Sequence, residues 1–347
     1  MKNILSLICF MFFNSLAFSE ITVVVPDDLV LMSGCSLPEA INHHGEVLFK
    51  YLEEGSCSYH YAIWSSKGGI EPVNDDKHLW IGINNTKTLF SDNSRLAIWS
   101  NHLGTQKIDT KRLGYNTKNH RIVGINSPGQ IIGNYETKNN IHKGFICEKG
   151  EAEEFILNDA EDLGFHIVGI KLIDINENGS ILGMLEYGER HPLKNLFYIT
   201  GRKYFLWDGS THVIEGADSS LDTTIKLNNM DEVAFTAFEM EKVDGEEREV
   251  SNTFKWSRDG DVKNISDNFS LTGFDDKGQI SGCEHLGVNS FRCLINHKGE
   301  HINLDAEIKK INPDIELINN PILSSSGVIL YWIRMWGENQ FVLIYVE

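Results

Sequence analysis

The clearest candidate for metal chemistry lies at residues 174–179, which read Asp-Ile-Asn-Glu-Asn-Gly. Oxygen-bearing side chains at alternate positions before a glycine match the first half of a calcium loop, because Ca²⁺ binds carboxylate and amide oxygens. The twelfth position of such a loop is normally Glu, and here it is Leu185. We therefore expect a plain turn and no cofactor, with calcium at Asp174, Asn176 and Asn178 as the alternative.

Side chains suited to ligand recognition or acid–base chemistry gather in two further segments, residues 186–202 and 239–251. We predict that the following residues bind a partner: Glu186, Arg190, His191, Tyr198, Glu246 and Glu247. Two solvated hairpin extensions are the alternative interpretation. No catalytic residue is assigned, because the chain contains no H-E-x-x-H, C-x-x-C or G-x-S-x-G motif of the zinc, thiol-redox or hydrolase types.

The N-terminus has the pattern of a secretory signal. A basic residue precedes an apolar run over residues 4–13, and Ala17-Phe18-Ser19 suits cleavage. We predict a signal peptide at residues 1–19, with an uncleaved membrane anchor as the alternative, and a single domain at residues 20–347. After cleavage we expect no direct insertion into a membrane, and we predict a periplasmic or extracellular protein.

Export permits disulfide bonds. Five cysteines follow residue 19: Cys35, Cys57, Cys147, Cys283 and Cys293. Cys283 and Cys293 flank an expected hairpin turn near residues 287–289, so we predict that they form a disulfide. Cys35 and Cys57 bracket the first repeat and form a second candidate pair. Cys147 lies in an apolar strand-like segment and is expected to be a buried free thiol.

These residues are set in a repeat that runs along the whole chain. Its core is an apolar residue, Asn, two polar residues and Gly, followed by an apolar strand. The marker position recurs at residues 42, 84, 126, 176, 228, 275 and 324, so successive copies are 42 to 52 residues apart. Strand-like repeats of this period are typical of propeller blades. We therefore predict an all-β, seven-bladed β-propeller of four-stranded antiparallel blades.

The third copy shows one unit in full. Its expected strands are residues 121–126, 130–135, 142–147 and 154–157, and Gly129 supplies the positive φ of the first turn. Glycines 133, 183 and 282 fall in the second strands, where crowding excludes a side chain. The last copy lacks a fourth strand, and we expect residues 21–25 to pair with residues 341–346 and so close the ring.

Four third strands end in tryptophan: Trp64, Trp99, Trp207 and Trp256. One large side chain per blade suits packing between neighbouring blades, and a ring that stacks on sugars is the alternative. Residues 60–64 (HYAIW) and 124–133 (GINSPGQIIG) resemble the extracellular HAF repeat family. The resemblance covers about residues 38–347, and it is weakest in copy seven, where three serines replace the Asn turn. It implies a β-propeller in an exported protein and implies no catalytic activity.

The charge balance narrows the choice of partners. The chain carries 49 acidic and 31 basic residues, a formal net charge of −18, which disfavours nucleic acid and anionic lipid surfaces. Second-to-third loops of a propeller leave the same face, and loops on a rigid scaffold commonly carry binding sites. We predict a monomeric, non-enzymatic exported propeller that binds a protein or glycan through that face. The alternative is a propeller-fold hydrolase or lyase that acts on a polysaccharide.

Overall fold

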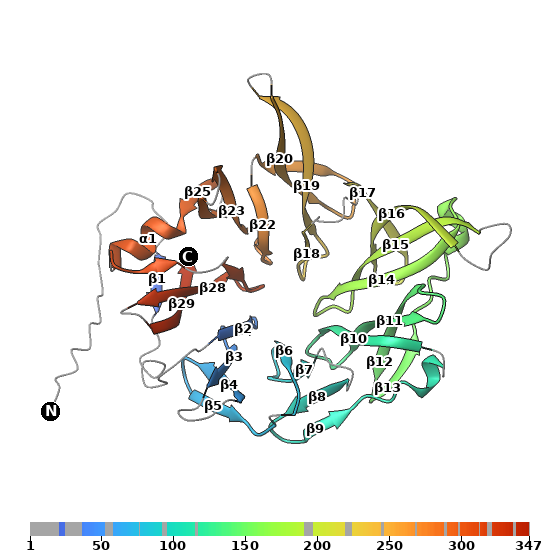
Figure 1. Cartoon of the computed structure of the whole chain (residues 1–347), viewed down its shortest axis with the longest axis horizontal. Helices are drawn as coiled ribbons and strands as arrows, with labels where there is room; N and C mark the ends of the chain where they lie inside the picture. Colours follow the sequence, from blue (N-terminus) through green and yellow to red (C-terminus); the bar gives the residue numbers. More distant parts are fainter. Residues whose placement is uncertain are drawn as a thin grey trace.

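The computed structural model confirms the seven-bladed propeller (Figure 1). It describes residues 21–346 except 25–36, 53–57, 76, 92–95, 115–116, 191–196, 219–223, 244–245, 268, 288–289, 298, 312, 318–320 and 336–337. Within these ranges the strands form seven separate antiparallel sheets arranged around a central axis. The predicted signal peptide lies outside the described residues. No helix in the described residues is long and apolar enough to cross a membrane.

The first four blades follow one another along the chain, each with its first strand nearest the axis (Figure 1). Blade one contains β2 (Leu37–Ile41), β3 (Val47–Leu52), β4 (Tyr59–Ser65) and β5 (Gly69–Val73). Blade two contains β6 (Trp80–Ile83), β7 (Leu89–Ser91), β8 (Ala97–Ser100) and β9 (Gly104–Lys107). Blade three contains β10 (Thr117–Ile125), β11 (Ile131–Thr137), β12 (His142–Glu148) and β13 (Glu151–Glu154). Blade four contains β14 (Ile167–Ile175), β15 (Ile181–Arg190), β16 (Phe197–Trp207) and β17 (Thr211–Asp218).

Blades five and six repeat this plan, and blade seven modifies it. Blade five contains β18 (Ile225–Leu227), β19 (Val233–Val243), β20 (Glu246–Trp256) and β21 (Val262–Ser266). Blade six contains β22 (Phe269–Phe274), β23 (Ile280–Gly287), β24 (Ser290–His297) and β25 (Glu300–Asn303). Helix α1 (Leu304–Ile311) then leads to the short β26 (Glu316–Leu317) and β27 (Ile322–Leu323), and to β28 (Val328–Met335) and β29 (Glu338–Val346). Three-residue and four-residue 3-10 helices, η2 (Lys111–Leu113) and η3 (Ala160–Leu163), lie between blades.

The predicted ring closure is confirmed. The N-terminal strand β1 (Ile21–Val24) pairs antiparallel with β29, with Ile21 opposite Val346 and Val24 opposite Leu343. The outer strand of blade seven therefore comes from the other end of the chain. This pairing covers an edge of β29 that would otherwise expose backbone donors and acceptors.

The buried hydrophobic residues in the described part of the chain form seven clusters, each between two neighbouring blades. Successive residues of a strand point to opposite faces of the sheet. Val47 and Phe49 accordingly pack on blade seven, whereas Leu48 between them packs on blade two. Each blade therefore shares its two faces with its two neighbours.

The four tryptophans at the ends of third strands lie in these inter-blade clusters. Trp64 packs on Phe341 of blade seven with 6.2 Å between ring centroids, and Trp207 meets Phe155 of blade three edge-on at 5.3 Å. Trp99 packs against blade one and Trp256 against blade four. The arrangement confirms the prediction of structural packing, because each tryptophan fills the seam with the preceding blade.

The predictions for the cysteines and for the fourth strand of blade three have different outcomes. The cysteine pair of blade six is confirmed: Cys283 and Cys293 face each other across β23 and β24 and form a disulfide, while Cys147 is free and buried. Cys35 and Cys57 lie outside the described residues. The fourth strand of blade three begins earlier in the chain than predicted: it occupies Glu151–Glu154 and not residues 154–157. Phe155 and Leu157, which suggested a strand, are buried between blades three and four instead.

Substitution of Gly183 by Ala is expected to destabilise the fold by about 1–3 kcal/mol. An added Cβ would lie 2.3 Å from the Phe205 ring and 2.9 Å from the Lys171 carbonyl oxygen, so the ring and the strand must both move. Urea unfolding measures the effect. Gly68→Ala is the control, since its methyl group would meet only the Ser65 hydroxyl. An unchanged unfolding midpoint for Gly183→Ala would contradict this account of crowding.

Candidate functional site

The repeat marker builds the same turn in each blade, between the first and second strands. In blade four the Asn176 side-chain oxygen accepts hydrogen bonds from the backbone N–H groups of Asn178 (3.1 Å) and Ser180 (2.9 Å). Gly179 has a φ of +86°, which suits glycine. The amide NH₂ of the same asparagine points towards the next blade, where it donates to the Asn228 carbonyl. The side chain that stabilises the turn therefore also joins two blades.

These contacts form an asparagine belt, made of the seven marker residues: Asn42, Asn84, Asn126, Asn176, Asn228, Asp275 and Ser324. In the first five, the side-chain Nδ2 donates to the marker carbonyl of the following blade. The distances are 3.0 Å (Asn42 to Asn84), 2.9 Å (Asn84 to Asn126), 3.3 Å (Asn126 to Asn176), 3.0 Å (Asn176 to Asn228) and 3.0 Å (Asn228 to Asp275). All marker side chains of the belt are buried. The belt therefore joins consecutive blades at one end of the disc.

The belt changes chemistry at its last two junctions. Asp275 has no amide to donate, and the link from blade six to blade seven runs instead from the Asp276 backbone N–H to the Ser325 carbonyl at 2.9 Å. The Ser326 hydroxyl then donates to the His43 carbonyl at 2.6 Å, which joins blade seven to blade one. Hydrogen bonds thus continue around the whole ring.

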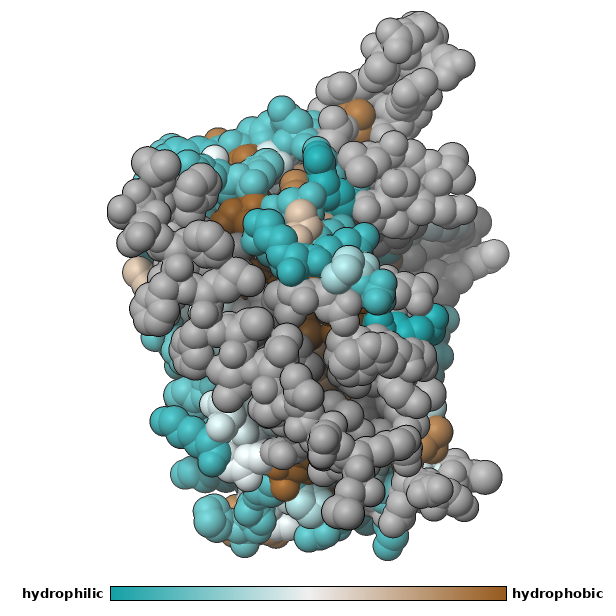
Figure 2. All heavy atoms as spheres, turned by 90° about the vertical axis from the view of Figure 1, so that its left-hand side faces the viewer, coloured by the Kyte–Doolittle hydropathy of each residue, from teal (hydrophilic) through white to brown (hydrophobic). Residues whose placement is uncertain are grey.

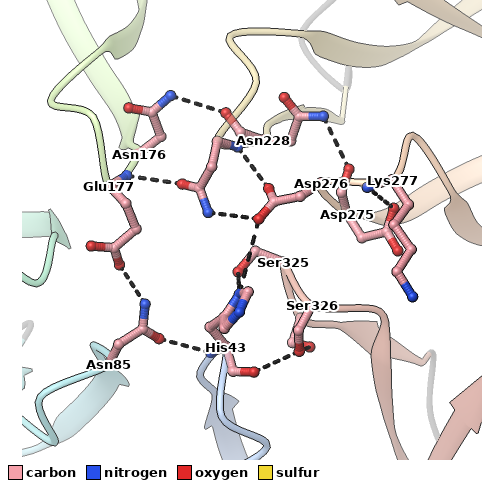
Figure 3. Close-up of polar contacts among 12 residues, drawn as sticks. His43, Asn85, Asn176, Glu177, Asn228, Asp275, Asp276, Lys277, Ser325 and Ser326 are labelled. Atoms are coloured by element: carbon pink, nitrogen blue, oxygen red, sulfur yellow. Dashed lines mark hydrogen bonds and ion pairs between the residues drawn. The ribbon is translucent and has the colours of Figure 1, made fainter.

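A second circle of polar side chains, the axial ring, comes from the residues directly after the markers: His43, Asn85, Ser127, Glu177, Asn229, Asp276 and Ser325. Figure 3 shows the labelled members from five blades facing one another around the axis. The His43 N–H donates to Asn85 Oδ1 (2.8 Å), and the Glu177 N–H donates to Asn229 Oδ1 (2.9 Å). The His43 imidazole Nδ1 lies 3.1 Å from the Ser325 hydroxyl.

The two carboxylates of the axial ring are held by amide donors. Glu177 accepts from Asn85 Nδ2 and from the Ser127 N–H, both at 2.8 Å. Asp276 accepts from the backbone N–H and the Nδ2 of Asn229, at 2.8 and 2.9 Å. Each carboxylate oxygen thus has a donor from another blade. This arrangement suits a structural clasp better than general acid–base catalysis, which needs an oxygen directed at a substrate.

The sequence analysis did not predict the axial ring, because the residue after each marker varies in type from one copy to the next. That residue is polar in all seven copies. An alignment of the seven copies against one another would have found the ring.

The predicted binding segments fold as long hairpins. Strands β15 and β16 pair as far as Arg190 and Phe197, and β19 and β20 as far as Val243 and Glu246. We call the parts at residues 186–202 and 239–251 the blade-four hairpin and the blade-five hairpin. The second strand runs antiparallel to the first, so both hairpins leave the end of the disc opposite the belt. Figure 1 shows the blade-five hairpin projecting beyond the ring of blades.

The predicted binding residues are not all alike in their positions. Tyr198 is 55% exposed on β16. Arg190 ends β15, and Glu246 and Glu247 begin β20 opposite Val243 and Lys242. His191 lies outside the described residues.

Glu186 is the exception, because it is buried in a charged cluster between blades three and four. Its carboxylate lies 2.9 Å from His142 Nδ1 and accepts from Arg202 Nε at 3.2 Å. Burial alone would raise the pKa of Glu186, but these two hydrogen bonds and the charges of His142 and Lys171 lower it. Glu186 is therefore an ionised link between blades at this position.

The residues considered for calcium are occupied in other ways. Asn176 belongs to the belt, and Asn178 Nδ2 donates to the Asn229 carbonyl. Burial raises the pKa of Asp174 to about 6, while the positive charge of Lys226 and a hydrogen bond from the Ile175 N–H oppose this rise. In the described part of the chain, no group of three or more His, Cys, Asp or Glu side chains is placed to hold a metal ion.

No family model matches the chain, and no curated protein matches it significantly. Solved structures do match. An acylaminoacyl peptidase from Pyrococcus horikoshii aligns at 14% identity and a TM-score of 0.50, over 86% of this chain and 50% of the peptidase, so the chain spans about half of that enzyme. The propeller domain of Cps50 (Swd1) from Myceliophteria thermophila aligns at 9% identity and 0.48, over 90% and 97%. The propeller domain of the Trilobed protease from Pyrococcus furiosus gives 9% and 0.47, over 91% and 84%. At such identities the likeness bears on fold alone, and the chain is a β-propeller.

Proposed function

We propose that this protein is an exported, non-enzymatic propeller that binds a protein or glycan partner through the end of the disc that carries the blade-four and blade-five hairpins. The predicted signal peptide, the resemblance to HAF repeats and the blade-six disulfide support export. The observation that carries the proposal is the length of these two hairpins. Their strands reach 10 or 11 residues, whereas β7 and β8 of blade two have three and four.

The blade-four hairpin offers the contact chemistry that such a role needs. Tyr198 and Ile199 are 55% and 45% exposed on consecutive positions of β16. A tyrosine supplies a large apolar face with a polar tip, which suits both protein interfaces and sugar rings. By contrast, the described surface on the side of blades six, seven and one is mainly hydrophilic, with small separate hydrophobic areas (Figure 2).

The blade-five hairpin supplies charge. Residues 239–251 contain six acidic and two basic residues, so the segment is strongly negative. Charges at the rim of an interface raise association rates and make binding dependent on salt. We propose that this hairpin steers a partner towards Tyr198 and Ile199 of the blade-four hairpin.

A polysaccharide hydrolase or lyase remains the second candidate, because Glu177 and Asp276 lie in one ring around the axis. Its support is weaker, since amide donors hold each oxygen of the two carboxylates. Replacement of Glu177 by Gln would abolish activity in such an enzyme, and in a binding protein it would affect only stability.

Replacement of both Tyr198 and Ile199 by Ser is expected to weaken binding at least tenfold without unfolding the protein, because both side chains are exposed. The probes are an array of defined glycans and the exported protein fraction of the source cells, with bound proteins identified by mass spectrometry. Affinity for the ligand that wild type retains is then measured for each variant. The double variant Arg190→Ala and His191→Ala tests the end of β15 and the residue that follows it in the sequence.

The matched control replaces two exposed apolar residues at the opposite end of the disc. Leu103 is 69% exposed in a third-to-fourth turn, and Met230 is 66% exposed in a belt turn. Their double serine variant should bind like wild type. If the control loses the ligand while the hairpin variant keeps it, the binding surface lies at the belt end and the proposal is wrong.

A further inference from the structure

One member of the asparagine belt does not fit the pattern. Five of the seven markers are Asn, and blade six has Asp275 at the equivalent position. Its Oδ1 behaves as in the other turns, accepting from the N–H groups of Lys277 (3.0 Å) and Gln279 (2.7 Å). Its Oδ2 takes the position of the amide nitrogen, which in the other blades donates to the next marker carbonyl. The next marker here is Ser324.

The second oxygen of Asp275 is buried beside another acceptor. Neither Asp275 Oδ2 nor Gln279 Oε1 has a hydrogen-bond partner among the described residues. Both face Gly327 in the turn of blade seven: a Cβ there would be 2.9 Å from Oδ2 and 3.4 Å from Oε1. The Gln279 amide nitrogen instead meets His297 Nδ1 on β24. With the Gln279 amide in this orientation, the two buried oxygens face the same glycine with no donor between them.

Buried polar atoms in native proteins are almost always paired, and an unpaired one costs about 1–3 kcal/mol. A proton on Asp275 would supply the missing donor. We propose that Asp275 carries its proton in the folded protein and donates it across the junction of blades six and seven, so that this junction is a pH-sensitive clasp. The acceptor is Gln279 Oε1 or the Ser324 carbonyl. Neither receives a hydrogen bond from a marker asparagine Nδ2, although the Ser324 carbonyl accepts from the Gly327 N–H of its own turn.

The surroundings favour the neutral acid. Burial raises the pKa of Asp275 to about 6, and the N–H groups of Gln279 and Lys277 and the charge of Lys277 offset this only in part. The other titratable groups nearby are Asp276 in the same turn, His297 behind Gln279, and His43 of blade one, whose Nδ1 is 3.9 Å from Asp276. The Lys255–Glu232 ion pair of blade five lies beside Gly278 of the same turn. The blade-seven turn, residues 324–327, contains only serine and glycine.

The direction of the pH effect follows from the sign of the shift. A carboxyl whose pKa is raised on folding binds its proton more tightly in the folded state. The contribution to stability is therefore complete at low pH and is lost as the pH rises through about 6. Mild acid tightens the junction, and neutral or alkaline pH places a buried negative charge against two acceptors and loosens it.

The test compares the full-length protein with its Asp275→Asn variant, which restores the marker of the other blades. Chemical unfolding is measured from pH 4 to 7.5. We expect the variant to become more stable relative to wild type as the pH rises, by on the order of a hundredfold in the unfolding equilibrium constant. The pKa of Asp174 is also raised by burial, and this group gives wild type and every variant the same pH dependence of stability. The measured quantity is therefore the difference in unfolding free energy between variant and wild type.

Asp276→Asn is the matched control, because this neighbouring carboxylate already has amide donors on both oxygens. The difference in unfolding free energy between Asp276→Asn and wild type should not increase as the pH rises. The carboxyl carbon signal of Asp275 in an NMR titration, identified by its loss in Asp275→Asn, should move near pH 6. A pH-independent difference for Asp275→Asn, or a signal that titrates near pH 4, would overturn the proposal. So would stabilisation of wild type alone by Na⁺ or Ca²⁺, because a cation would then be the missing partner.

Discussion

Removal of residues 20–26 is expected to lower the stability of the propeller by several kcal/mol and to promote self-association. The deletion removes β1, whose four residues pair with Leu343–Val346. Each backbone hydrogen bond contributes about 1 kcal/mol, and the uncovered edge of β29 becomes a template for pairing with another chain. Thermal unfolding and light scattering measure the two effects.

The appropriate control is a chain that begins at residue 20. It lacks the predicted signal peptide but keeps β1, so it should unfold as a single cooperative transition at a higher temperature than the shorter chain. Equal unfolding midpoints for the two chains would mean that β1 contributes nothing to closure.

Substitution of Asn176 by Ala is expected to cost about 3–5 kcal/mol, although the side chain is small. It leaves three backbone groups without their partners: the N–H groups of Asn178 and Ser180 and the carbonyl of Asn228. Buried groups left unpaired in this way each cost about 1–3 kcal/mol. Urea unfolding monitored by tryptophan fluorescence checks the magnitude.

Asn178→Ala provides a comparison within the same turn. Its side chain is exposed and makes one hydrogen bond, to the Asn229 carbonyl. We expect a loss below about 1 kcal/mol. Similar losses for the two variants would show that the belt contributes no more than an ordinary surface turn.

The fold was predictable because its signals are local and repeated. Gly129 has the positive φ that its turn requires, and tryptophan occurs at the position of Trp64 in three other copies. The closing strand was also predictable, since the last copy is one strand short. In each case the evidence is the residue type at one position of the repeat, or the number of strands that one copy contains.

The candidate site was less predictable because its contacts join residues of different repeats. Glu186 was expected to face a partner, yet it binds His142, 44 residues earlier on the neighbouring blade. Likewise Glu177 holds Asn85 across blade three. A residue on a second strand can point to either adjacent blade or to solvent, and periodicity alone does not distinguish the two blades.

The belt also has a direction, and this has a mechanical consequence. From Asn42 to Asn228 every side-chain amide donates to the following blade, so five peptide-like dipoles point the same way around the axis. Dipoles arranged head to tail polarise one another and strengthen each bond in the series. The series stops at Asp275, which makes the ring an open chain with a first and a last member. Under heat or applied force, blade seven should therefore separate first, at its junctions with blades six and one, and blades one to six should stay joined as an arc.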